Sequence, residues 1–149
     1  MATLQNQLDL AKKITQSKLK DDLFKFIKSI EKDLIAKNQE QLREDSSDIF
    51  GSPIGFYNAA TEAITQGSKK RGEPFDAYDT GDLFKGMYMQ EVSGVIRFGS
   101  KSPHWADIQK SESWLSTELF GLTDENLKEV IAQKLLPFFL ENSRKLLNL

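Results

Sequence analysis

The sequence MYMQEVSGVIRFG, residues 87–99, decides the fold class, because it is the only convincing β region of the 149-residue chain. Side chains of Met87–Val92 alternate with the two-residue period of a strand, and Val95–Phe98 supplies a return strand. Ser93 and Gly94 between them are suited to a two-residue hairpin turn. Two strands alone are marginally stable in water, so this hairpin needs a helix beneath it or strands from another chain.

Upstream of the hairpin, the segment from Leu4 to Arg43 is predicted to be helical, because apolar residues recur at helical spacing and no proline or glycine interrupts them. The apolar positions are Leu8, Ala11, Leu19, Leu23, Phe26, Ile30 and Leu34. One uninterrupted helix would be about 60 Å long, which exceeds what a compact domain of this size can cover. We therefore favour a break near Thr15–Ser17 over a single helix that projects against another chain.

A loop-rich stretch connects this section to the hairpin. Within it, Phe56–Gln66 is predicted to form a short helix with Gly67 at its C-cap. The aperiodic loop Ser68–Tyr78 follows and contains the basic cluster Lys69-Lys70-Arg71. Long loops of this kind are often binding elements, although its aromatic residues Phe75 and Tyr78 are as well suited to anchoring the loop to its own core.

Downstream of the hairpin the chain is predicted to be helical again. Pro103 is suited to the first turn of a helix that reaches about Glu112, and Thr123 is a strong N-cap for the last helix. Pro137 lacks the N–H group that a continuous helix would use, so a kink or restart is expected there. The sequence thus predicts a mainly helical α+β fold in a single domain, with residues 1–44 a helical section and residues 45–149 the α+β body.

Composition limits the function classes. Hydrophobic residues make up 39% and charged residues 28% of the chain, as expected of a soluble globular protein, and there is no cysteine. No apolar run approaches the ~20 residues of a membrane-spanning helix. The N-terminal residues lack the apolar core of a signal peptide, which favours synthesis in the cytoplasm. A net charge of -2 argues against a broad surface for duplex DNA.

No catalytic constellation is recognisable, and no cofactor or metal is predicted. His104 is the sole histidine of the chain. Four acidic residues, Glu73, Asp76, Asp79 and Asp82, could gather a hard cation only on a helix, which Gly81 disfavours. Turn formation is the better interpretation, with Asp79 or Thr80 capping a short turn that contains Leu83 and Phe84.

From about Tyr78 onward, the order of short motifs resembles the head–tail connector, or tail-completion, proteins of tailed bacteriophages, also called virion-morphogenesis proteins. The matching motifs are Thr80-Gly81-Asp82-Leu83 before the hairpin, Phe98-Gly99-Ser100 and Trp105-Ala106-Asp107-Ile108-Gln109 after it, and Leu119-Phe120-Gly121-Leu122-Thr123-Asp124-Glu125 at the last helix. The resemblance covers about half of the chain.

The resemblance implies a structural, non-enzymatic role. Such proteins form a ring in the phage neck below the portal, join the head to the tail and help to retain DNA. The implied partners are further copies of the chain, the portal and other neck or tail proteins, with DNA only passing through the lumen and no membrane contact. The implied location is the virion, after synthesis in the host cytoplasm. The candidate interface residues are Lys69, Lys70, Arg71, Phe75, Tyr78, Thr80, Gly81, Leu83, Trp105, Trp114, Phe138 and Phe139.

Two alternatives from other classes stay open at this point. One is a helical adaptor or regulatory protein that uses the kinked C-terminal helix as its docking face. The other is a metal-dependent nuclease that uses the four acidic residues between Glu73 and Asp82.

Overall fold

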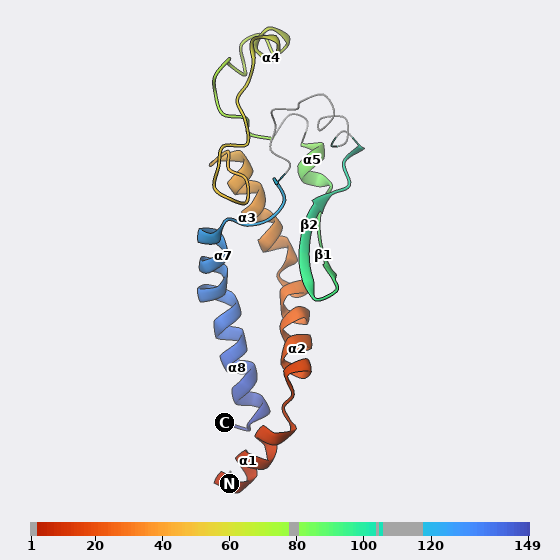
Figure 1. The fold of residues 1–149 in the computed structure, drawn as a ribbon, viewed down its shortest axis with the longest axis vertical. Coiled ribbons are helices and arrows are strands. Elements are labelled where there is room, and N and C mark those ends of the chain that lie inside the picture. Colours follow the sequence, from red (N-terminus) through yellow and green to blue (C-terminus); the bar gives the residue numbers. More distant parts are fainter. Residues whose placement is uncertain (1–2, 78–80, 104, 106–117) are drawn as a thin grey trace. The chain divides into compact units, whose positions relative to one another are not determined.

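The computed structural model describes residues 3–77, 81–103, 105 and 118–149, and it confirms a mainly helical α+β fold with one two-stranded antiparallel sheet (Figure 1). The elements in chain order are α1 (Leu4–Lys13), α2 (Gln16–Ser29), α3 (Glu31–Arg43), α4 (Ala59–Ile64), α5 (Asp82–Lys85), β1 (Met87–Val92), β2 (Val95–Ser100), α7 (Asp124–Val130), the π-helical turn η1 (Ile131–Leu135) and α8 (Leu136–Leu146).

The chain divides into two compact units. The first, here called the helix unit, contains Met1–Glu31 and Leu127–Leu149, and the second, the mixed unit, contains Lys32–Asn126. These boundaries differ from the division at residue 44 that the sequence suggested, because α3 contributes its side chains to the mixed unit.

The N-terminal helical section is interrupted twice. The predicted break near Thr15 is confirmed: α1 ends at Lys13, and the Thr15 hydroxyl accepts a hydrogen bond from the Lys18 amide at 3.1 Å to cap α2. A second interruption lies at Ile30, whose φ of -104° and ψ of 16° leave the helical range between α2 and α3. The sequence has no proline or glycine at this break, and the Ser29 hydroxyl beside it donates to the Phe26 carbonyl at 2.6 Å.

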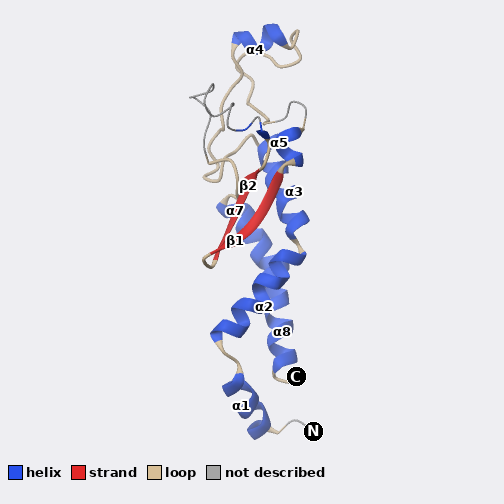
Figure 2. Ribbon diagram, turned by 90° about the vertical axis from the view of Figure 1, so that its right-hand side faces the viewer, coloured by secondary structure: helices blue, strands red, loops and turns tan. Residues whose placement is uncertain are grey.

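In the helix unit, α2 packs against α8 as an antiparallel pair. The rings of Phe26 and Phe138 stack with centroids 4.2 Å apart, and the Asn142 amide donates a hydrogen bond to Asp22 at 3.0 Å. As the residue number rises along α2, the number of its partner on α8 falls, which is the signature of antiparallel helices. Figure 2 shows the two helices side by side.

The helix changes type just before Pro137, where a kink or restart is expected. A π-helical turn occupies Ile131–Leu135, and α8 then begins at Leu136 with Pro137 in its first turn. The backbone stays in the right-handed helical range at Val130, Leu135 and Leu136, and the Leu136 amide donates to the Ile131 carbonyl. The helix therefore continues through the π turn and does not restart at Pro137.

The mixed unit has a small apolar core. Its buried members are Leu42, Ile54, Ala77, Leu83, Met87 and Leu119, and Ile35, Phe75, Phe84, Trp105 and Phe120 pack around them. These residues come from α3, the loops on either side of α4, α5, β1 and the segment before α7. The core therefore joins parts of the chain that lie far apart in the sequence.

A buried polar clamp on α3 holds the segment before α7. The Asn38 amide group donates to the carbonyls of Leu119 (3.1 Å) and Gly121 (2.7 Å), and its oxygen accepts from the Gly121 amide at 3.1 Å. One turn later, the Gln41 side-chain oxygen accepts from the Thr123 amide at 2.9 Å. Both side chains are buried from water. Their hydrogen bonds therefore satisfy backbone groups of the segment before α7 that water does not reach.

The predicted hairpin is confirmed in position and turn. Ser93 and Gly94 have φ values of 52° and 80°, which two-residue type I′ turns require, and Val92 faces Val95 across the turn. Tyr88 faces Gly99 in the register, and a Cβ added at Gly99 would lie 2.7 Å from the Tyr88 hydroxyl. The tyrosine ring thus covers the glycine, and a larger residue at position 99 would require the ring to move.

The short helices differ in detail from the expectation. The helix predicted over Phe56–Gln66 is shorter, Ala59–Ile64, because Phe56 forms a β-bridge with Pro74 and Asn58 caps the helix. The cap residue is Thr65 rather than Gly67, although the Gly67 amide bonds to the Glu62 carbonyl at 2.9 Å and closes the helix end.

Two further expectations fall partly or wholly on residues that are not described, and a third is confirmed. The helix α5 follows Gly81, whose φ is 83° and which has no side chain to cap it, whereas the proposed caps Asp79 and Thr80 lie outside the described residues. Most of the helix predicted after Pro103 also lies outside them. The N-cap at Thr123 is confirmed, because its hydroxyl accepts from the Asn126 amide at 3.2 Å.

Candidate interaction surfaces

The acidic residues of the Ser68–Tyr78 loop and its surroundings take part in local contacts. Asp76 accepts a hydrogen bond from the Tyr57 hydroxyl at 2.6 Å and pairs with the Lys69 ammonium at 3.6 Å, and Glu73 accepts from the Lys70 amide at 3.3 Å. The fourth acid of the suggested cluster, Asp79, lies outside the described residues. Within the described part of the chain, no group of three or more histidine or acidic side chains could hold a metal ion.

The basic cluster of the same loop is only partly available to a partner. The Lys69 ammonium lies 5.1 Å from the centre of the Tyr57 ring and pairs with Asp76, so its charge is engaged within the loop. Lys70 and Arg71 are exposed, and the Arg71 amide bonds to the Glu62 carboxylate at 3.1 Å. Lys70 and Arg71 are therefore exposed cations of the loop, and their backbone amides are held by the Glu73 and Glu62 carboxylates.

Four of the candidate interface residues are committed to internal packing. Phe75 and Trp105 pack around the core of the mixed unit, where Trp105 meets Phe120 edge-to-face at 5.0 Å, and Leu83 is a buried core residue. Phe138 stacks on Phe26 in the helix unit. Aromatic residues of this kind gain most of their stabilisation from burial, so their large side chains serve the fold.

The remaining candidates differ in exposure. Gly81 is buried, whereas Phe139 is exposed. Tyr78, Thr80 and Trp114 lie outside the described residues.

The structure shows further exposed apolar residues, of which only Phe139 is among the candidates predicted from the sequence. In the mixed unit these are Phe50, Phe56 and Ile64 and, at the hairpin tip, Val92 and Val95. In the helix unit the C-terminal helix exposes Leu127, Ile131, Leu136, Phe139 and Leu140, and α1 exposes Leu4 and Leu8. Where such side chains lie together on one face, they are typical of a surface that binds another protein.

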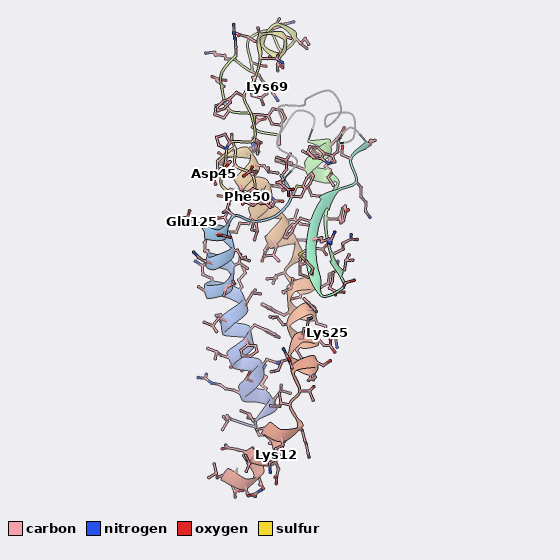
Figure 3. The ribbon with its side chains drawn as sticks, in the orientation of Figure 1. Lys12, Lys25, Asp45, Phe50, Lys69 and Glu125 are labelled. Carbon is pink, nitrogen blue, oxygen red and sulfur yellow. The ribbon has the colours of Figure 1, made fainter. Side chains whose placement is uncertain are left out.

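The Phe50 loop, residues 44–54, holds its aromatic residue in a fixed position. The Asp48 carboxylate accepts hydrogen bonds from the amides of Phe50 and Ser52, both at 2.9 Å, and the Gly51 amide bonds to the Asp48 carbonyl at 3.0 Å. Phe50 is nevertheless 75% exposed. An Asx turn therefore presents a large apolar side chain to solvent from an ordered loop (Figure 3).

The five exposed residues of the C-terminal helix, here called the helix face, lie on one side of that helix because of η1. A π turn bonds residue i to i+5, so Ile131 and Leu136 are brought about one turn apart. In an uninterrupted α-helix a five-residue step would place them on nearly opposite sides. The other side of the helix carries Val130, which is buried, and Phe138, which packs on α2.

The two units carry formal charges of opposite sign. The helix unit contains ten basic and six acidic side chains and has a net charge of +4, whereas the mixed unit contains ten basic and sixteen acidic side chains and has a net charge of -6. Together they give the -2 of the whole chain. Lys12 and Lys25 of the helix unit and Asp45 of the Phe50 loop are labelled in Figure 3.

One ionised group on α2 makes the helix unit sensitive to acid. The Lys18 ammonium, hydrogen-bonded to Asp22, and secondly the Asn142 amide hold the pKa of Asp22 below its ordinary value of 3.8. A carboxyl group with a depressed folded-state pKa stabilises the fold fully above its unfolded-state pKa, and the stabilisation is lost as the pH falls through the folded-state pKa.

We therefore expect Asp22→Asn to remove this acid-sensitive contribution. The gap in unfolding free energy between the wild-type chain and Asp22→Asn should be widest above about pH 5 and close as the pH falls further. Urea denaturation across this range, followed by circular dichroism, measures the gap. The matched control is Asp21→Asn, since Asp21 is exposed and makes none of these contacts; an equal effect of both variants would contradict the prediction.

No helix in the described part of the chain is long and apolar enough to cross a membrane. Comparison of the chain with protein-family models, with curated proteins and with solved structures gives no match.

Proposed function

We propose that the chain is a non-enzymatic structural protein of a tailed-phage neck, where copies form a ring below the portal that joins head to tail. The motif order from Tyr78 onward motivates this assignment, and the hairpin is the observation that supports it best. Met87 of β1 belongs to the core of the mixed unit and Met89 is buried, so the chain itself covers one face of the two-stranded sheet. The feature that a second copy could use is the free edge of the sheet.

The outer edge of β2 is suited to such an extension. Val92 and Val95 form the pair that closes the two-residue turn. In an antiparallel pair every second residue of a strand bonds to the partner strand, so Val95 and Arg97 face β1. The backbone N–H and C=O groups of Ile96 and Phe98 therefore point away from β1. On that edge these groups have no hydrogen-bond partner among the described residues. A strand from a neighbouring subunit could bond there, as strands do in β-augmentation.

The neck assignment also agrees with the modest net charge. A lumen that lets DNA pass must not bind phosphates tightly, and a chain with a net charge of -2 supplies no excess of cations for that purpose. Virion location, the ring and the portal contact are parts of the same proposal.

The test is a density-gradient separation of a lysate from the source, with the chain quantified in each fraction by mass spectrometry. The proposal predicts co-migration with DNA-filled particles at a low, fixed number of copies per particle. Confinement to fractions that contain no particles would overturn it.

A helical adaptor is the second candidate, and the exposed helix face favours it. An adaptor would bind a defined partner protein through Leu127, Ile131, Leu136, Phe139 and Leu140 and would be found in the particle-free fractions. The same gradient therefore separates the two candidates.

A further inference from the structure

The Phe50 loop has the properties of a binding anchor. Aromatic residues that are presented rigidly lose little conformational freedom on binding and are frequent among the residues that dominate interface energies. Phe50 is 75% exposed, while the two hydrogen bonds from the Phe50 and Ser52 amides to Asp48 hold its backbone in place. The loop also carries two exposed acidic residues, Glu44 and Asp45.

The helix face has the complementary properties. It is apolar over several turns, and the helix that bears it has four basic and two acidic side chains between Leu127 and Leu149. The basic residues are Lys128, Lys134, Arg144 and Lys145. An acidic loop with an apolar tip and a basic unit with an apolar face are matched in both charge and polarity.

We propose that the Phe50 loop of one copy binds the helix face of a second copy. The inference rests on the proposed function, because this contact would join neighbouring copies in the ring. The opposite formal charges of the two units, -6 for the mixed unit that bears the loop and +4 for the helix unit that bears the face, favour a second copy as the partner. The two patches are different, so the contact is heterologous: each copy uses its loop towards one neighbour and its face towards the other. Repeated contacts of this type produce rings when the rotation closes.

The experiment compares the association of purified full-length variants by sedimentation velocity. Wild-type protein is expected to associate with rising concentration, and Phe50→Ala is expected to raise the dissociation constant about 30-fold or more. Leu136→Ser combined with Leu140→Ser should have a similar effect, because it removes the other half of the contact. Ile64→Ala is the matched control, since Ile64 is an 82% exposed apolar residue of the mixed unit that lies outside the proposed contact.

Mixing the two defective variants tests the head-to-tail arrangement directly. Phe50→Ala retains an intact helix face and the double serine variant retains an intact loop, so an equimolar mixture should form a dimer with one intact contact and no larger species. Rising salt should weaken this dimer, because the charges of the two units attract each other. All variants change exposed side chains, and circular dichroism verifies that each is folded.

Several outcomes would overturn the contact: a wild-type chain that stays monomeric, a Phe50→Ala variant that associates like wild type, or a mixture that remains monomeric. The gradient experiment is independent of these results. If the protein is bound to particles but this contact is absent, the neck assignment is retained and the contact is rejected. If head-to-tail dimers form but no protein is bound to particles, the contact is retained and the neck assignment is rejected.

Discussion

Asn38→Asp is expected to lower the free energy of unfolding of the mixed unit by about 3–5 kcal/mol, the range for a buried charge left without a partner. The substitution keeps the size of the side chain and the oxygen that accepts from the Gly121 amide. It replaces the amide group that donates to the Leu119 and Gly121 carbonyls with a carboxylate oxygen. At neutral pH this oxygen carries no proton, so it cannot donate to either carbonyl. Since the residue is fully buried, water cannot take the place of the lost donor.

The measurement is urea denaturation at neutral pH, followed by tryptophan fluorescence, because Trp105 packs around the core of the mixed unit. The control is Glu40→Gln, an exposed position on the same helix, with an expected change within about 0.5 kcal/mol. A second readout separates charge from packing. Burial raises the pKa of the introduced carboxyl group, so the deficit should shrink as the pH falls and the protonated group donates one hydrogen bond. A variant as stable as wild type at neutral pH would show that the clamp does not hold the segment before α7.

Phe138→Ala is expected to lower the unfolding free energy of the helix unit by about 2–3 kcal/mol, less than for a fully enclosed phenylalanine because this ring is only partly buried. The substitution removes the ring that stacks on Phe26 with centroids 4.2 Å apart, an aromatic contact between α2 and α8. Urea denaturation followed by far-ultraviolet circular dichroism measures the loss, since the helix unit is helical throughout its elements.

Phe139 provides a matched control for the same experiment. It is the adjacent residue of the same type but is exposed on the helix face, so Phe139→Ala should cost less than about 1 kcal/mol. Equal losses for Phe138→Ala and Phe139→Ala would mean that the stack on Phe26 does not hold the two helices together.

The elements that the sequence predicted well are those whose signals are local. The hairpin follows from strand alternation and from Ser93-Gly94, two residues that can adopt the positive φ values of a type I′ turn. The break at Thr15 and the start of α7 after Thr123 follow from hydroxyl groups that cap a helix three residues ahead. Each of these depends on residues within one turn of the chain.

The sequence was less informative about the surfaces. Residue type predicts Phe75, Trp105 and Phe138 as interface candidates, yet all three serve internal packing. Phe50, which residue type alone does not single out, is the aromatic residue that is exposed in an ordered loop. Whether an aromatic side chain is buried depends on which distant segments cover it. Phe50 could have been suspected from Asp48 two residues before it and Gly51 after it, a pattern typical of a tight turn.

The sequence by itself determined the mainly helical character, the hairpin, the break at Thr15 and the start of α7, because periodicity, turn residues and capping act within a few residues. Only the tertiary structure decided the rest. Asn38 and Gln41 look like ordinary surface residues of a polar helix, and they became a buried clamp because Leu119–Thr123 folds over them across about eighty positions of sequence. The π turn at Ile131–Leu135 likewise carries no local signal apart from Pro137, yet it aligns Ile131 with Leu136 into the helix face. Burial and alignment are properties of segments brought together in space, so they appear only when the chain is folded.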